Sequence, residues 1–201
     1  MLSKSQYFLF SFSLIFLLTA CSKEEALIPK PRIYPRVQFP ERTFSAFELS
    51  SCDFEFKRPD HTRIERDTAF FDGAPVHSCW FDLFYPNFDA RLHFSYYPVD
   101  KFNSFEKLRQ DAFVLAQKHN AKANYIDEIP LEKNERVKGM IFQLEGEVAS
   151  PVQFYLTDER SNFLRASLYF NTKSRPDSLA PIVDFIKEDI SQLVQTFEWT
   201  N

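Results

Sequence analysis

The side chains that could carry chemistry in this chain are histidines, cysteines and a few closely spaced carboxylates. The histidines are His61, His77, His93 and His119. No two of them have the i, i+2 or i, i+4 spacing that places two imidazoles on one metal ion. Glu145 and Glu147 could share one face of a strand and hold a cation weakly, but a solvated strand end explains them more simply. We therefore expect no catalytic residues, no metal site and no cofactor.

The thiol of Cys21 has a different chemistry, because it ends a segment with the features of a secretion signal. Lys4 supplies a short basic start, and residues 7–20 form an uncharged apolar run. That run is shorter than the roughly 20 residues that a membrane-spanning helix needs. Residues 18–21 read Leu-Thr-Ala-Cys and resemble the bacterial lipobox, in which the peptidase cuts before a lipidated cysteine. We expect removal of residues 1–20 and lipidation of Cys21; the alternative is an ordinary signal peptide with a coincidental cysteine.

Cys52 and Cys79 then remain as an even pair in an exported chain, where disulfides persist. Each cysteine opens an expected strand, so a cross-strand bridge is sterically reasonable. Closing the loop between them would stabilise the fold by about 3.5 kcal/mol in the chain-entropy model. The alternative is two buried free thiols, and the spacing resembles neither a redox pair nor a metal pair.

Residues 21–42 are expected to form an extended tether between the anchor and a folded domain. Its prolines are Pro29, Pro31, Pro35 and Pro40. Proline has no N–H and restricts the residue before it, so the segment cannot form a helix or a central strand. The tether is either a spacer or a docking strip for a partner protein. The residues that we single out for docking are Pro29, Pro31, Tyr34, Arg36 and Phe39.

The composition limits the possible classes of protein. The 201 residues are 44% hydrophobic and 17% aromatic, which suits one ordered domain and excludes wholesale disorder. A formal net charge of −4 argues against a nucleic-acid partner. A mean hydropathy of −0.33 argues against a protein with many membrane spans. Only three glycines are present, which excludes glycine-rich phosphate loops.

Residues 43–201 predict a single α+β domain. Apolar residues alternate with polar ones in several short runs, which is typical of half-buried antiparallel strands. The expected strands are 52–56, 62–65, 79–85, 90–97, 125–129, 136–144, 152–157 and 163–170. Helices are expected over 104–119 and 177–197, each with an apolar stripe suited to packing on a sheet. The predicted fold is an antiparallel sheet flanked by two helices.

An ordered series of motifs resembles one family of bacterial lipoproteins. The motifs are residues 18–21, Pro29-Lys30-Pro31-Arg32, Tyr34-Pro35-Arg36, residues 52–56, Cys79-Trp80-Phe81, residues 94–98, Gly139-Met140, residues 153–158, residues 166–170, Asp189-Ile190 and Glu198-Trp199. Together they resemble the gliding-motility lipoprotein family GldD of Bacteroidetes over essentially the whole chain. The order of strands and helices resembles, more weakly, the Mog1/PsbP-like α/β/α sandwich, and a fold does not transfer a function.

The resemblance implies a noncatalytic envelope lipoprotein that is required for gliding motility and type IX protein secretion. It would bind the membrane through its lipid and act through contacts with other gliding and secretion proteins of the envelope. The acidic run at residues 22–25 resembles a surface-export signal or is a solvated spacer. We expect the outer rather than the inner membrane, with the leaflet open.

The alternative function is a surface-exposed or periplasmic lipoprotein that binds a ligand or glycan. Aromatic residues of two expected strands would form its stacking platform. These residues are Phe81, Tyr85, Tyr96 and Tyr97.

Overall fold

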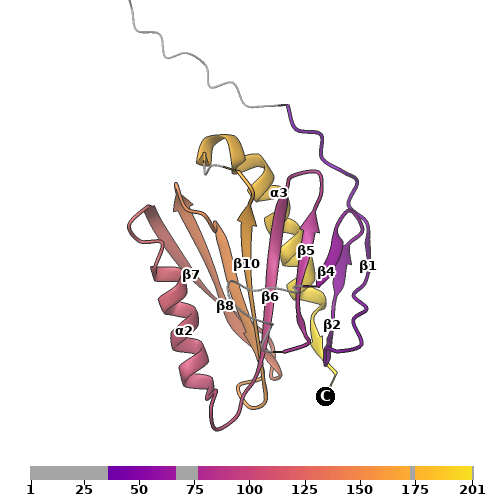
Figure 1. The fold of residues 1–201 in the computed structure, drawn as a ribbon, viewed down its shortest axis with the longest axis vertical. Helices are drawn as coiled ribbons and strands as arrows, with labels where there is room; N and C mark the ends of the chain where they lie inside the picture. The colour runs from indigo at the N-terminus through magenta and orange to yellow at the C-terminus, as the bar shows by residue number, and fades with distance from the viewer. Residues whose placement is uncertain (1–35, 67–76, 173–174, 201) are drawn as a thin grey trace, which may run out of the picture. The chain divides into compact units, whose positions relative to one another are not determined.

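The computed structural model describes residues 36–66, 77–172 and 175–200, which form an α+β domain (Figure 1). The elements are β1 (Phe44–Ala46), β2 (Phe54–Glu55), β3 (Lys57–Pro59), β4 (Arg63–Arg66), β5 (Trp80–Tyr85), β6 (Ala90–Pro98), α2 (Phe105–Gln117), β7 (Ala123–Asn134), β8 (Val137–Gly146), β9 (Val152–Thr157), β10 (Asn162–Phe170), α3 (Pro176–Thr196) and β11 (Glu198–Trp199). The fold class predicted from the sequence is confirmed.

The main sheet has seven strands in the order β4-β5-β6-β10-β9-β8-β7, and every neighbouring pair is antiparallel. Strand β10 lies in the middle, with Ser167 opposite His93 of β6 on one side and Gln153 of β9 on the other. Because directly opposed residues point to the same face, this register brings polar side chains of distant segments into one row.

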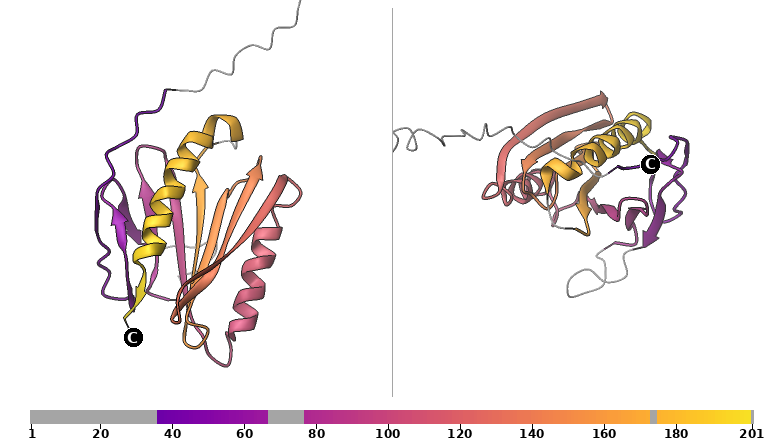
Figure 2. Two further views of the ribbon diagram at one scale, coloured as in Figure 1. Left: turned by 180° about the vertical axis from the view of Figure 1, so that it is seen from behind. Right: turned by 90° about the horizontal axis from the view of Figure 1, so that it is seen from above.

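Each face of the sheet is covered by one helix. Helix α3 packs Ile186 and Leu193 against Phe81, Phe94 and Leu164, and this layer holds most of the core. A second cluster packs α2 on the opposite face; its buried members include Leu108, Ala112, Phe142, Tyr155 and Phe163. Figure 2 shows α3 running across the sheet in the view from behind. We call the two surfaces of the sheet the α3 face and the α2 face.

A disulfide joins Cys52, just before β2, to Cys79 at the start of β5, with 5.2 Å between the two Cα atoms. Strand β2 pairs with β11 at the end of the chain, where Phe54 lies opposite Trp199. The disulfide and this short ladder together attach the segment before β3 to the main sheet and to the C-terminal residues.

The structure differs from the expected strands in β7, in β2, which is shorter than expected, and in the short strands β1, β3 and β11, which were not expected. Strand β7 extends to Asn134, whereas we expected it to end at Ile129, before Pro130. Because β7 is an edge strand, a proline can stand in it without removing a hydrogen bond that the sheet needs. The three-residue strand β1, which pairs with β3, was not expected because so short an element has no detectable alternation.

Candidate functional site

The chain makes contact with the domain earlier than the expected boundary at residue 43. Val37 packs against the core, and the ring of Phe39 stacks on Phe185 of α3 with 4.8 Å between ring centroids. Phe39 also lies 5.9 Å from Phe88. The last residues of the expected tether are apolar enough to find partners on α3, so they form part of the folded surface.

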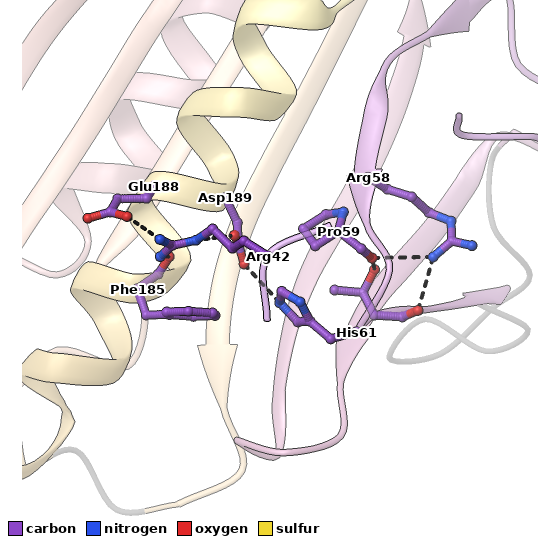
Figure 3. A network of polar contacts seen from close by, with 8 residues as sticks. Arg42, Arg58, Pro59, His61, Phe185, Glu188 and Asp189 are labelled. Carbon is purple, nitrogen blue, oxygen red and sulfur yellow. Dashed lines mark hydrogen bonds and ion pairs between the residues drawn. The ribbon is translucent and has the colours of Figure 1, made fainter. Parts of the chain in front are cut away.

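Arg42 attaches this segment to helix α3 through several polar contacts (Figure 3). Its Nε donates to Oδ1 of Asp189 at 3.0 Å, and its Nη2 donates to the carbonyl oxygen of Phe185 at 3.0 Å. Its Nη1 also forms an ion pair with Glu188. The guanidinium carbon lies 4.1 Å from the centre of the Phe185 ring, within range of a cation–π interaction.

The carboxylate of Asp189 is fully buried, and two side chains contact it. His61 Nε2 lies 3.0 Å from Oδ2, while Arg42 occupies Oδ1. Burial raises the pKa of Asp189, and its contacts with His61 and Arg42 oppose that rise. We call Arg42, His61, Phe185, Glu188 and Asp189 the clamp.

His61 reaches the clamp because the turn between β3 and β4 is held in place. Thr62 Oγ1 donates to the carbonyl oxygen of Pro59 at 2.6 Å, and Arg58 Nη1 donates to the carbonyl oxygen of Thr62 at 3.1 Å. The backbone N–H of Asp60 donates to the carbonyl oxygen of Thr43, next to Arg42. The same turn therefore positions both side chains that contact Asp189.

The clamp holds the chain through its carboxylate. Both oxygens of Asp189 are occupied, and truncating one partner of a buried charge is strongly destabilising. The clamp therefore fixes the segment that leads toward the N-terminus onto helix α3.

The residues singled out for docking are only partly described. Phe39 lies on α3, with 42% of its surface exposed. Arg36 is exposed. Cys21, Pro29, Pro31 and Tyr34 lie outside the described residues.

A second polar cluster lies on the α2 face, across strands β5, β6, β10 and β9. Asp82 Oδ1 lies 2.6 Å from His93 Nδ1. Ser167 and Gln153 continue the row, and both are buried, at 4% and 1% exposure. An acid, an imidazole and a hydroxyl in this order are the residue types of a hydrolytic triad.

The geometry of this row does not activate Ser167. Its Oγ is buried and has no hydrogen-bond partner among the described residues, so His93 does not hydrogen-bond to it. Strand β10 is paired on both sides at Ser167, so its backbone amides belong to the sheet rather than to an oxyanion hole. In the described ranges, no three His, Cys, Asp or Glu side chains gather closely enough to hold a metal ion.

The prediction that four aromatic residues form a stacking platform is wrong. Phe81, Tyr85 and Tyr96 are buried on the α3 face, where they pack in the core. Only Tyr97 lies on the α2 face, because it has the opposite parity on β6.

The comparison with protein families decides what kind of chain this is. The profile described as gliding motility lipoprotein GldD matches residues 24–199. The chain belongs to the GldD family. Membership makes it a component of gliding motility and a lipid-anchored protein of the cell envelope. Across residues 36–66, 77–172 and 175–200, no helix is both long and apolar enough to cross a membrane.

Among curated proteins, none matches the chain significantly. Two solved structures are similar over 80% of the chain. PsbP from the cyanobacterium Synechocystis has 8% identity and a TM-score of 0.48, and 94% of its chain is covered. The Ran-binding protein Mog1p of Saccharomyces cerevisiae has 9% identity and a TM-score of 0.47, and 97% of its chain is covered. At these TM-scores, we draw no conclusion about this chain from the two similar structures.

The sequence contains a signal for the clamp that our interpretation missed. Asp189 lies three residues after Ile186 and four before Leu193, within the apolar stripe of α3. A carboxylate in the core-facing stripe of a helix requires buried partners. That position indicates a charged contact, although it does not name Arg42 or His61.

Proposed function

We propose that this GldD-family chain is a noncatalytic component of the gliding and type IX secretion apparatus, anchored in the outer membrane through Cys21. It acts by contacts with other envelope proteins. The observation that carries the proposal is the clamp, which attaches the segment nearest the anchor to a buried carboxylate of α3. A clamp of this kind sets where the tether leaves the domain.

In this account the proline-rich residues between Cys21 and the described part of the chain act as the tether. At about 3.1 Å per residue, an extended proline-rich segment of this length reaches roughly 45 Å. A force on the anchor passes through the tether to Arg42 and from there to α3.

We further propose that a partner protein contacts the exposed side of Phe39 and four residues that precede it: Pro29, Pro31, Tyr34 and Arg36. Tyrosine and arginine are enriched among residues that dominate binding energy at interfaces. Phe39 is already fixed on Phe185, so its exposed side presents a rigid apolar surface beside the tether. Such preorganisation reduces the entropy lost on binding.

The test is a cross-linked pull-down of the tagged lipoprotein from native membranes, with mass spectrometry of the partners. In one variant, residues 29–35 are replaced by a Gly/Ser linker of equal length, which leaves the clamp intact. Wild type should recover gliding and secretion proteins, and the linker variant should lose them. Retention with the linker would move the interface to the folded domain. Recovery of no envelope protein by wild type would contradict the assembly role.

A further inference from the structure

A groove of about 380 Å³ lies on the α2 face, between helix α2 and strands β6 and β10. Its floor is apolar and includes Phe163, Leu108 and Ala112. Its charged lining consists of Arg165, Lys107, Lys118 and Asp111. At about 30 Å³ per water molecule, the space would hold roughly a dozen waters or one small organic molecule.

Arg165 brings an uncompensated positive charge to this groove. Its Nη2 donates to Oε1 of Gln153 at 2.8 Å, and within the described ranges it forms no ion pair with a carboxylate. Burial lowers the pKa of Arg165, which shows that the charge is held away from water. A guanidinium has five N–H donors, and Arg165 lines the groove with donors beyond the one bound to Gln153.

Gln153 holds the guanidinium in place. Its side chain is almost fully buried, and its Oε1 is the acceptor for Arg165. Its Nε2 is buried without a partner, as is Oγ of Ser167 beside it in the polar row. Gln153 therefore fixes the cation of Arg165 beside the groove, and the two buried polar atoms lie behind it without a partner among the described residues.

The surroundings of Arg165 favour an anion. Arg165, Lys107 and Lys118 give three positive charges against the single carboxylate of Asp111, an excess of two. His119 adds no charge at neutral pH, because burial and the charge of Arg165 lower its pKa. An oxyanion can pair with a guanidinium through two parallel hydrogen bonds, which is the strongest such contact available.

We propose that this groove binds a small organic anion whose carboxylate or phosphate pairs with Arg165 and whose apolar part lies on Phe163 and Leu108. The site is separate from the clamp and does not depend on the proposed assembly role. It also replaces the stacking platform expected from the sequence, because the recognition element is a buried cation rather than a surface of aromatic rings.

The experiment is ¹⁹F NMR of small probes with the mature lipoprotein in lipid nanodiscs, with empty nanodiscs as the blank. The probes are 4-fluorophenylacetate, 4-fluorophenyl phosphate and the uncharged 4-fluorophenylacetamide. At least one anion should show a saturable shift, and the amide should show none. The acid and the phosphate separate a carboxylate ligand from a phosphate ligand. Binding of the amide as tight as that of the anions, or no binding of any probe, overturns the proposal.

Arg165→Gln should weaken binding of the anion at least tenfold, because it removes the charged donor. The matched control is Arg63→Gln, at an exposed position of β4, and it should leave the affinity unchanged. If Arg165→Gln does not fold, the double variant Lys107→Gln/Lys118→Gln decides, since both lysines are exposed on or next to α2. The double variant should weaken binding of the anion about threefold or more. An affinity that stays unchanged in whichever of these variants folds would contradict anion binding in the groove.

Discussion

The Nε of Arg42 and the Oδ1 of Asp189 are 3.0 Å apart although 147 residues separate them in the chain. One residue follows the proline-rich tether, and the other lies on the buried side of the last helix. The contact therefore joins the part of the protein nearest the lipid to the hydrophobic core. Its consequences for stability, pH dependence and gliding can each be measured.

Arg42→Met should lower the free energy of unfolding by about 1.5–3 kcal/mol, because it leaves the buried carboxylate of Asp189 with His61 alone. Urea unfolding followed by fluorescence measures this loss. The matched control is Arg36→Met, since Arg36 is exposed and lies outside the clamp. Equal stability of the two variants would show that the clamp does not stabilise the fold.

The loss caused by Arg42→Met should be larger near pH 7 than near pH 4. Burial already raises the pKa of Asp189, and removing Arg42 takes away one of the charges that oppose this rise. A carboxyl whose pKa is raised in the folded state contributes most stability below its unfolded pKa of about 4, and that contribution disappears as the pH rises through the folded value. Unfolding curves at both pH values test the sign.

The double variant Arg42→Met/Asp189→Asn is the control for this pH dependence. The loss of stability caused by Arg42→Met is then measured between Asp189→Asn and the double variant. Without an ionisable group at position 189, this loss should be the same near pH 7 and near pH 4. A loss of equal size at both pH values in Arg42→Met itself would mean that Asp189 is not the group responsible.

Gly139→Ala should destabilise the domain by about 1–3 kcal/mol, the usual cost of forcing extra volume into packed structure. A Cβ at this position would lie 1.9 Å from the carbonyl oxygen of Tyr155 in the neighbouring strand, so β8 and β9 would have to separate. Glu145→Ala, at an exposed position of β8, is the control and should cost much less. Thermal unfolding distinguishes the two, and similar melting temperatures would contradict the close approach.

Ser167→Ala should leave gliding intact if the protein is noncatalytic. The Oγ of Ser167 is buried without a hydrogen bond, so its removal should also leave the stability unchanged or raise it slightly. The measurement is complementation of a strain that lacks the protein, with immunoblots to match protein levels. Loss of gliding by a folded variant at the wild-type level would point to a reaction at the Asp82, His93 and Ser167 row.

The strands of the sheet could be predicted from the sequence where alternation is strong. Strand β9 has the expected bounds, and β5, β6 and β10 differ by one residue at one end. The turn before β10 is local as well, because Asp158 Oδ1 accepts from three successive backbone N–H groups there. These features depend on local chemistry, which a short stretch of sequence contains.

The polar sites could not be predicted in the same way, because each depends on strand register or on contacts between distant segments. Asp82 and His93 have no spacing that indicates a pair, and they meet only because β5 and β6 align them as direct partners. Arg165 alternates with apolar residues on β10 like any solvent-facing residue, and only the position of α2 encloses it in a groove. Arg42 followed a run of prolines, which suggested a tether rather than a contact.

The most direct test of the account is the gliding speed of single cells that carry Arg42→Met, at equal levels of membrane-bound protein. The control is Arg63→Met, at an exposed position of β4 outside the clamp and the tether. If the clamp sets how the domain is attached to its anchor, Arg42→Met should slow or stop gliding while Arg63→Met glides at the wild-type speed. Hydrogen exchange at residues 37–42 reports in the same samples whether the clamp is released. Gliding at wild-type speed with the clamp released would contradict the account.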